Sequence, residues 1–374
     1  MSIDELKQKQ QAAVLAEANR VMVICNACRY CEGICAVFPA MGLRRTFTAG
    51  ELNYLANLCH NCRGCYYCCQ FAPPHEYKLN FPQAMCALRT QTYEQTAKPA
   101  FLRKLFPNNA FYVFTVSLVS TVLLTLISLC SAGAADFFGV HTEPGSFRKI
   151  MPYWAMLTVF GASLLFALVA LWMGVCALWK LTDGKKQWMD WESHKKAIRD
   201  VLFLTYLDGG GDGCNYPDDR FTFTRRWFHH GVFYGFMLCL AATIVAFFLD
   251  HGLARPGPYS YFSLPVIFGT IGGLGLCVGT GGMLWLKLVM DPRPSNSDSV
   301  GMDMAFSMLL FLVSFSGLLL LFFRSTEFMG LLLCVHLGLV LGFFLTMPCG
   351  KFMHAVYRYA ALVRNAHEQR TEQI

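Results

Sequence analysis

The chain has 374 residues, of which 55% are hydrophobic and only 15% are charged. As a whole, the chain is too apolar to be an ordinary soluble protein. The net charge of +7 lies between apolar runs, so it reports membrane topology and not nucleic-acid binding. We expect an all-α protein with a soluble domain at 1–107, a membrane domain at 108–364 and a C-terminal tail at 365–374.

Two matching cysteine runs follow a predicted amphipathic helix at residues 2–20. Each run has the spacing C-x2-C-x2-C-x3-C, which is typical of proteins that hold two [4Fe–4S] clusters. In two-cluster ferredoxins the fourth cysteine of each run ligates the other cluster. The predicted ligands are Cys25, Cys28, Cys31 and Cys69 for one cluster, and Cys59, Cys62, Cys65 and Cys35 for the other.

Other interpretations of these cysteines are weaker. Disulfides need an oxidising compartment, and residues 1–20 lack the apolar stretch of a signal peptide. Zinc sites use two widely separated cysteine pairs, which does not account for eight cysteines at these spacings. Cys68 is an alternative fourth ligand in the second run, but Cys69 restores the spacing of the first run. Cys86 lies outside both sets and is expected to be a structural thiol.

The stretch between the two runs predicts a helix. Thr48 and Glu51 form the S/T-x-x-E pattern of a capping box, and leucines follow at helical spacing. A helix between two cluster loops resembles the α-helical ferredoxin domain of fumarate reductase and heterodisulfide reductase iron–sulfur subunits. Pro39 departs from the usual pattern, because it comes four residues after the last cysteine of the first run instead of directly after it.

Six uncharged stretches are long enough to span a bilayer, which takes about 20 helical residues. They must be helical because lipid cannot satisfy exposed backbone groups. The last two are joined by a short turn and form a hairpin. The predicted spans are Phe111–Cys130, Met151–Trp179, Gly231–Leu249, Val266–Leu286, Met304–Phe323 and Phe328–Pro348.

Lysine and arginine are distributed unequally across these spans. One side has only Arg148, Lys149, Arg255 and Arg324, whereas the other has the basic segment before the first span and the long basic loop after the second. By the positive-inside rule the richer side is cytoplasmic. Both termini and both clusters are therefore expected in the cytoplasm, where thiols stay reduced.

Histidines at membrane depth are functional candidates, and histidine is a usual axial ligand of haem iron. Spans three and six run antiparallel, which brings His230 and His354 to the same cytoplasmic face. At 1.5 Å per residue, His251 and His336 lie about 32 and 27 Å further along these helices, at similar depth on the far side. We predict a b-type haem on His230 and His354, and as a further expectation a second haem on His251 and His336. His229 is the alternative to His230, because helical neighbours point about 100° apart.

Three further features are interpreted as structural. His60, beside a cluster cysteine, and His194, in a charged loop, are expected to be ordinary side chains. Gly209–Gly213 follows no strand, so it indicates a flexible turn and not a dinucleotide site. Gly269–Gly282 is rich in glycine within span four, which favours close helix packing over a substrate path.

Several segments together resemble one known family over nearly the full length. They are the two cysteine runs, Leu52–Cys62, Gly209–Pro217 leading into Arg225–His230, and Pro348–His354. They resemble the tricarballylate- or citrate-utilisation protein B family, and the Lys-x-x-His element ending span six is also similar to the haem-binding element of nitrate reductase gamma subunits. The resemblance implies a multi-pass protein of the bacterial inner membrane. It also implies that the protein reoxidises an FAD-dependent tricarballylate dehydrogenase and passes electrons into the lipid bilayer.

These observations favour an electron-transfer protein that carries electrons from reduced flavin through two [4Fe–4S] clusters and haem b to quinone. No catalytic side chain is expected, because the partner and the cofactors carry the chemistry. A tricarboxylate transporter, a redox sensor and a subunit of a heterodisulfide- or nitrate-reductase-like complex stay open as alternatives. A trianionic substrate would need basic residues at the membrane midplane, and the predicted spans contain none.

Overall fold

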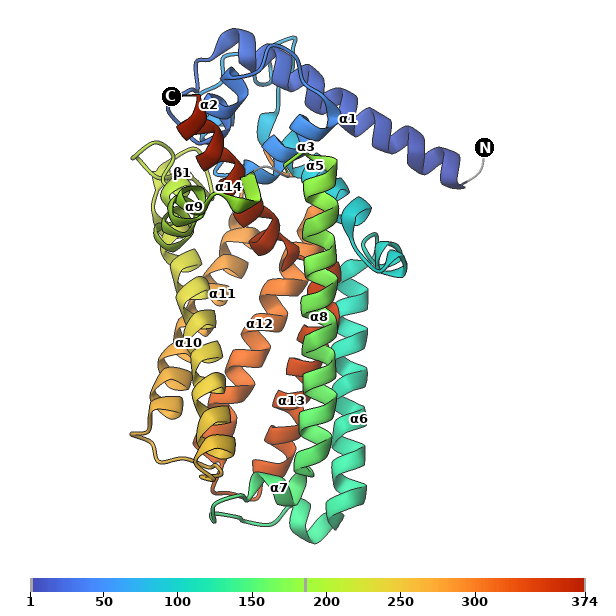
Figure 1. The fold of residues 1–374 in the computed structure, drawn as a ribbon, viewed down its shortest axis with the longest axis vertical. Coiled ribbons are helices and arrows are strands. Elements are labelled where there is room, and N and C mark those ends of the chain that lie inside the picture. The colour runs from blue at the N-terminus through green and yellow to red at the C-terminus, as the bar shows by residue number, and fades with distance from the viewer. Residues whose placement is uncertain (1–2, 185–186, 373–374) are drawn as a thin grey trace.

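The computed structural model describes residues 3–184 and 187–372, which form a bundle of long helices with a smaller helical head at one end (Figure 1). Within these residues, six helical segments are long and apolar enough to cross a membrane, as predicted. They are α6 (Asn109–Phe137), α8 (Tyr153–Leu181), α10 (Thr224–Gly252), α11 (Leu264–Val289), α12 (Ser297–Phe323), and α13 (Met329–Thr346) with the 3-10 turn η4 (Met347–Cys349). The helix α12 begins before Met304, where the predicted span begins. The predicted span contains only uncharged residues, whereas the helix also includes the charged residues Asp298 and Asp303.

Helices α10 and α11 pack backbone to backbone. A Cβ atom added at Gly235 would lie 2.7 Å from the amide N of Leu276 and 2.8 Å from the carbonyl O of Gly272. Small residues are what allow helices to approach this closely in a membrane. The glycine-rich stretch Gly269–Gly282 therefore serves helix packing, as predicted.

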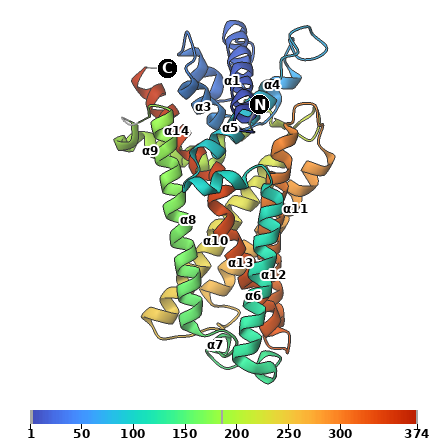
Figure 2. The ribbon, with the colours of Figure 1, turned by 90° about the vertical axis from the view of Figure 1, so that its right-hand side faces the viewer.

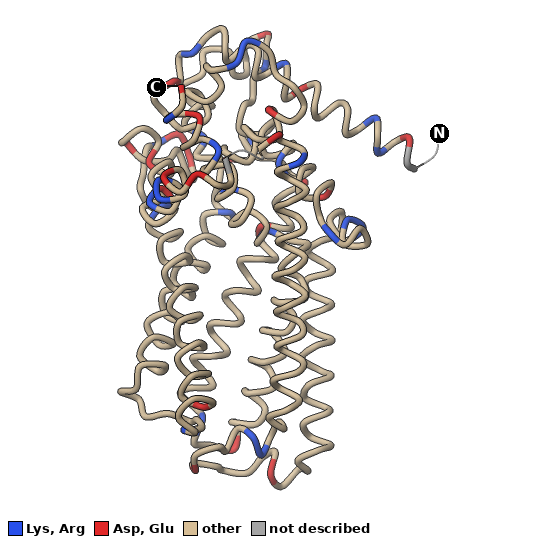
Figure 3. Tube along the Cα trace, in the orientation of Figure 1, with Lys and Arg blue, Asp and Glu red and all other residues tan. Residues whose placement is uncertain are grey.

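Charged residues gather at the two ends of the bundle and leave a long uncharged zone between them (Figure 3). At the end far from the head, the short helix α7 (Phe147–Ile150) lies between α6 and α8, and Arg148 pairs with Asp250 of α10. The uncharged zone matches the apolar interior that a bilayer provides.

The N-terminal part of the head is built of helices that precede, separate and follow the cysteine loops. They are α1 (Ile3–Cys28), α2 (Val37–Gly42), α3 (Ala49–Leu58), α4 (Gly64–Tyr67), α5 (Phe81–Thr96) and the 3-10 helix η1 (Ala100–Leu105). The helix α1 extends beyond the predicted end at residue 20. The predicted capping box of α3 is confirmed, since Thr48 N–H donates to Glu51 and Glu51 N–H donates to the Thr48 hydroxyl.

Two later parts of the chain complete the head. The loop after α8 contains η2 (Gln187–Met189), α9 (Trp191–Phe203), η3 (Thr205–Leu207) and a two-stranded hairpin of β1 (Cys214–Asn215) and β2 (Phe221–Thr222). After the last span, α14 (Met353–Thr371) rises into the head and contacts α9, α3 and α8 (Figure 2). Its Glu368 binds both Arg44 and Arg364.

The residues predicted as a C-terminal tail are 365–374. Up to Thr371 they do not form a separate segment. They continue α14, and Asn365, Ala366 and Glu368 are buried against the head. Residues 373 and 374 lie outside the described residues. The protein is all-α apart from the short hairpin, which contains the two strands found among the described residues.

Candidate functional site

The first set of thiols lines a cavity in the head to which both cysteine runs contribute. Cys25 and Cys28 lie one turn apart at the end of α1, so their side chains share one face of that helix. Burial, together with the neighbouring thiols of Cys69 and Cys28, raises the pKa of Cys25 to about 12. The thiols that line the cavity are those of Cys25, Cys28, Cys31, Cys65 and Cys69. Cys69 of the second run thus lies among the cysteines of the first run.

The second set of thiols places Cys35 of the first run among cysteines of the second run. Burial raises the pKa of Cys35, and the thiols of Cys62 and Cys59 raise this pKa further. Burial also raises the pKa of Cys65, which interacts with the same three thiols. Cys65 interacts in addition with Cys25, so the two sets are neighbours within the head.

The fourth position of the first set has two neighbouring candidates. Cys69 lines the cavity together with Cys25 and Cys28. The Sγ atom of Cys68 lies 3.5 Å from the Sγ atom of Cys31. Both residues therefore lie near this set, and Cys69 stays the predicted ligand.

The backbone of the cysteine loops turns its N–H groups toward the thiols. Arg29, Asn61 and Arg63 have φ angles of 54°, 55° and 70°, a left-handed conformation that is uncommon outside glycine. Successive N–H groups in such turns form concave sites that bind anions, including iron–sulfur clusters. In the second loop, Asn61 N–H donates to Cys59 Sγ at 3.4 Å.

Arginines bind the carbonyl groups of the same loop. Arg89 donates to the Cys59 carbonyl at 2.7 Å, and Arg225 donates to the carbonyls of His60 and Asn61. These bonds satisfy the buried carbonyl oxygens from outside the loop, which leaves its N–H groups directed toward sulfur.

The two thiol sets fit two cubane clusters. Among the described residues no three His, Cys, Asp or Glu side chains could together hold a single metal ion. A cubane does not need such a point, because each of its four thiolates ligates a different iron atom. Four thiols around each centre, with amide N–H groups directed at sulfur, are the donor set that a [4Fe–4S] cluster requires.

The structure directs His229, and not His230, toward His354. Burial lowers the pKa of His354, and the neighbouring charges that lower this pKa further include that of His229. The Nδ1 atoms of His229 and His354 are buried and have no hydrogen-bond partner among the described residues. The His230 ring instead lies 6.1 Å from Trp227 and 5.8 Å from Tyr234. Adjacent residues point in different directions on α10, so these contacts favour the alternative pair of His229 and His354 over the predicted pair of His230 and His354.

His60 lies beside this pair. Burial lowers its pKa, as do Arg358, His354 and His229. Two histidines on different helices, each with an unpartnered ring nitrogen, fit the axial ligation of a b-type haem. His60 directly follows Cys59 of the second thiol set in the chain. Sequence reasoning treated His60 as ordinary.

The second predicted histidine pair is not brought together by the contacts of the described residues. The His336 Nδ1 atom lies 3.1 Å from the Val313 carbonyl and 3.2 Å from the Ser316 hydroxyl. The His251 ring stacks on Phe247 at 4.1 Å and its Nδ1 atom lies 2.9 Å from the carbonyl of that residue. The two rings thus contact different residues among those described, and a second haem on His251 and His336 stays a prediction.

Comparisons with known proteins agree with these features. The family model described as "Citrate utilization protein B" matches residues 107–374, and the model described as "Citrate utilization protein B Fer4-like domain" matches residues 18–95. The chain belongs to the citrate utilization protein B family. Citrate utilization protein B of Escherichia coli is 44% identical over 359 residues, which cover 95% of this chain and 93% of that protein. No solved structure matches the chain.

The Fer4-like family model covers both cysteine runs, so the head of this family member is Fer4-like. The family resemblance drawn from the sequence is confirmed by the same comparisons.

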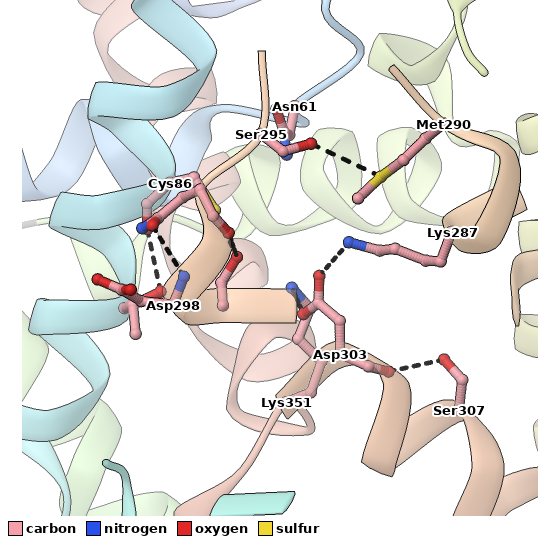
Figure 4. A network of polar contacts seen from close by, with 12 residues as sticks. Asn61, Cys86, Lys287, Met290, Ser295, Asp298, Asp303, Ser307 and Lys351 are labelled. Carbon is pink, nitrogen blue, oxygen red and sulfur yellow. Dashed lines mark hydrogen bonds and ion pairs between the residues drawn. The ribbon is translucent and has the colours of Figure 1, made fainter. Parts of the chain in front are cut away.

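A buried ion-pair network links the head to the bundle in this member of the citrate utilization protein B family. Asp303 of α12 binds the Nζ atoms of Lys287 and Lys351, each at 2.6 Å (Figure 4). It therefore connects α11, α12 and the segment that leads into α14. Above it, Arg63 of the second cysteine loop donates to the Ser295 hydroxyl.

Two residues near the thiol sets were not found from the sequence. Cys214, in β1, is buried and hydrogen-bonds to Cys62, which lowers the pKa of the Cys62 thiol. The turn Gly209–Gly213 holds this strand close to the first cysteine loop, because a Cβ atom on Gly210 would lie 2.9 Å from the Gly33 carbonyl. Arg358, on α14, lies near Cys59 and Cys35. For Cys214, the signal available in the sequence was a free cysteine directly after a glycine-rich turn. Arg358 has no such signal, and only the fold places it near the thiols.

Proposed function

We propose that this protein is the membrane electron-transfer component of a citrate- or tricarballylate-utilising system, and that it carries electrons from the reduced FAD of a partner dehydrogenase to quinone. The observation that supports this most is the crossing of the two cysteine runs into two neighbouring thiol sets, placed above an apolar bundle. The family membership supports the metabolic context.

Ten side chains would hold the redox groups. Bound [4Fe–4S] clusters and haem supply one-electron carriers. In this protein they would connect a two-electron flavin to a lipid-soluble quinone. The cluster ligands would be Cys25, Cys28, Cys31 and Cys69 for one centre and Cys35, Cys59, Cys62 and Cys65 for the other, and the haem ligands would be His229 and His354.

The rest of the head would bury and orient these groups. The α14 helix packs against α3 and α9 and thereby keeps water from the second thiol set, and the arginine bonds to the Cys59 and His60 carbonyls fix its loop. The excess of basic residues on the head side supports a cytoplasmic head and a bacterial inner-membrane location.

The first experiment is metal analysis of the full chain purified anaerobically in detergent. We expect about eight cluster irons and haem in the same preparation, with EPR signals of reduced [4Fe–4S] clusters. A protein with zinc but no sulfide or cluster signal would refute the proposal.

A second experiment tests the haem ligand on α10. We expect the His229→Ala variant to lose the haem absorption bands and the matched His230→Ala variant to keep them, because only His229 is directed toward His354. Loss of the bands in His230→Ala alone would restore the pairing with His230.

The direction of electron flow needs the partner. Mixed with substrate-reduced dehydrogenase and a quinone analogue, vesicles that contain the protein should reduce the quinone, whereas a redox sensor would not turn over. Uptake of labelled citrate by vesicles with this protein alone would favour a transporter, which the uncharged middle of the bundle opposes (Figure 3).

A further inference from the structure

A buried arginine in the head has no partner for its charge. Arg358 is only 6% exposed. Its Nε, Nη1 and Nη2 atoms are all buried and have no hydrogen-bond partner among the described residues. A guanidinium carries five N–H donors and stays protonated, so burying it without an acceptor is strongly unfavourable. The described residues therefore supply this guanidinium with no acceptor, and an anion bound beside it would stabilise its charge.

The other buried arginines of the head differ in this respect. Arg63 donates to Ser295, Arg89 donates to the Cys59 carbonyl, and Arg364 donates to Glu368. The fold thus supplies acceptors to each of these guanidinium groups but leaves Arg358 without one.

The surroundings of Arg358 indicate which anion would pair with its guanidinium group. Burial lowers the pKa of Arg358, and the thiols of Cys59 and Cys35 act in the opposite direction. The nearby side chains of Arg89, His60 and His354 are neutral or positively charged, so they cannot balance the positive charge of Arg358. The acidic groups that act on it are the thiols of Cys59 and Cys35 and the phenol of Tyr93. Burial raises the pKa of Tyr93 and keeps its phenol neutral, which leaves the two thiols of the second set as the groups that can become anionic.

We propose that Arg358 is the buried counter-cation of the iron–sulfur cluster held by Cys35, Cys59, Cys62 and Cys65, and that it raises the reduction potential of this cluster. Four thiolates make the cluster anionic, and reduction adds one electron and one further negative charge, which a fixed cation stabilises. Net charge and nearby hydrogen bonds are known determinants of cluster potentials. The inference rests on the proposed function, since it needs the cluster to be present.

The position of Arg358 also explains why the head needs α14. The helix carries Arg358 one turn after His354, so the same helix face serves the second thiol set and the histidine pair. A carboxylate of a bound haem is the rival anion for this guanidinium, and the test separates the two.

The test compares three variants of the full chain, loaded anaerobically, by EPR-monitored redox titration. Arg358→Gln removes the charge, Arg358→Lys keeps it, and Arg293→Gln removes a charge from a side chain that is 71% exposed. In Arg358→Gln, we expect the reduced-to-oxidised ratio of one cluster at a fixed potential to fall about tenfold or more, which is about 59 mV for one electron. Arg358→Lys should stay close to the wild type, and Arg293→Gln should be unchanged.

Each outcome decides the inference. Loss of one cluster in Arg358→Gln, with retention in Arg358→Lys, would also support the counter-cation. Full cluster content with unshifted cluster potentials, a shift of the haem potential alone, or loss of the cluster in both Arg358 variants would overturn it. Absence of clusters from the wild type would instead refute the proposed function.

Discussion

Replacing Asp303 by asparagine removes the carboxylate that holds Lys287 and Lys351 together. Both lysine Nζ atoms lie 2.6 Å from its oxygens, and the three side chains are 12%, 16% and 19% exposed, in the order Asp303, Lys287, Lys351. Breaking a buried pair by removing one partner costs about 3–5 kcal/mol, because the remaining charge stays buried. The amide can still accept one hydrogen bond and some water reaches the site, so we expect a loss near the lower end, about 3 kcal/mol.

The expected change in melting temperature follows from the size of the chain. With an unfolding entropy of about 2.1 cal/mol/K per residue, 374 residues give roughly 0.8 kcal/mol/K, so Tm should fall by about 4 °C. The assay is thermal unfolding of wild type and variant in the same detergent at one scan rate.

The matched control is Glu192→Gln, the same acid-to-amide change at a surface pair. Glu192 and Lys195 are 61% and 55% exposed, and such pairs contribute about 0–1 kcal/mol. We expect no change in Tm for this control. If Asp303→Asn melted at the same temperature as wild type, the network would contribute no net stability and the reasoning would be refuted.

Three further predictions concern the head and the bundle. Iron analysis of Cys69→Ser should show about four cluster irons instead of about eight, while Cys68→Ser keeps about eight; the reverse result would exchange the two ligands. Gly235→Val should weaken the packing of α10 on α11 and lower Tm, because its Cβ has no space there. Hydrogen bonds, led by that of Ser193, hold the pKa of Asp190 well below its usual value. Its contribution to stability is therefore complete above about pH 4 and is lost as the pH falls through the lower folded pKa, so the Tm difference between wild type and Asp190→Asn should shrink in acid.

The parts of the fold that depend on local sequence were predictable. Span positions follow from uncharged length, and the start of α3 follows from Thr48 and Glu51, because a capping box is complete within four residues. The close packing of α10 on α11 followed from glycine content. The cysteine spacing also predicted that Cys69 lies among the thiols of the first run and Cys35 among those of the second.

The parts that depend on contacts between distant segments were not predictable. His229 and His230 differ only in the direction they face, which is set by how α10 packs on α11. Arg358 and Cys214 are far from the cysteine runs in sequence and reach them only through the fold. The predicted tail failed for the same reason, since nothing local to residues 365–371 shows that the head covers them.

The order of synthesis gives the last helix a particular consequence. The head's cysteines leave the ribosome first, whereas α14, which covers them, is made only after every span. Assembly of the head must therefore wait for the bundle to enter the lipid, and a chain arrested during insertion would have these thiols uncovered.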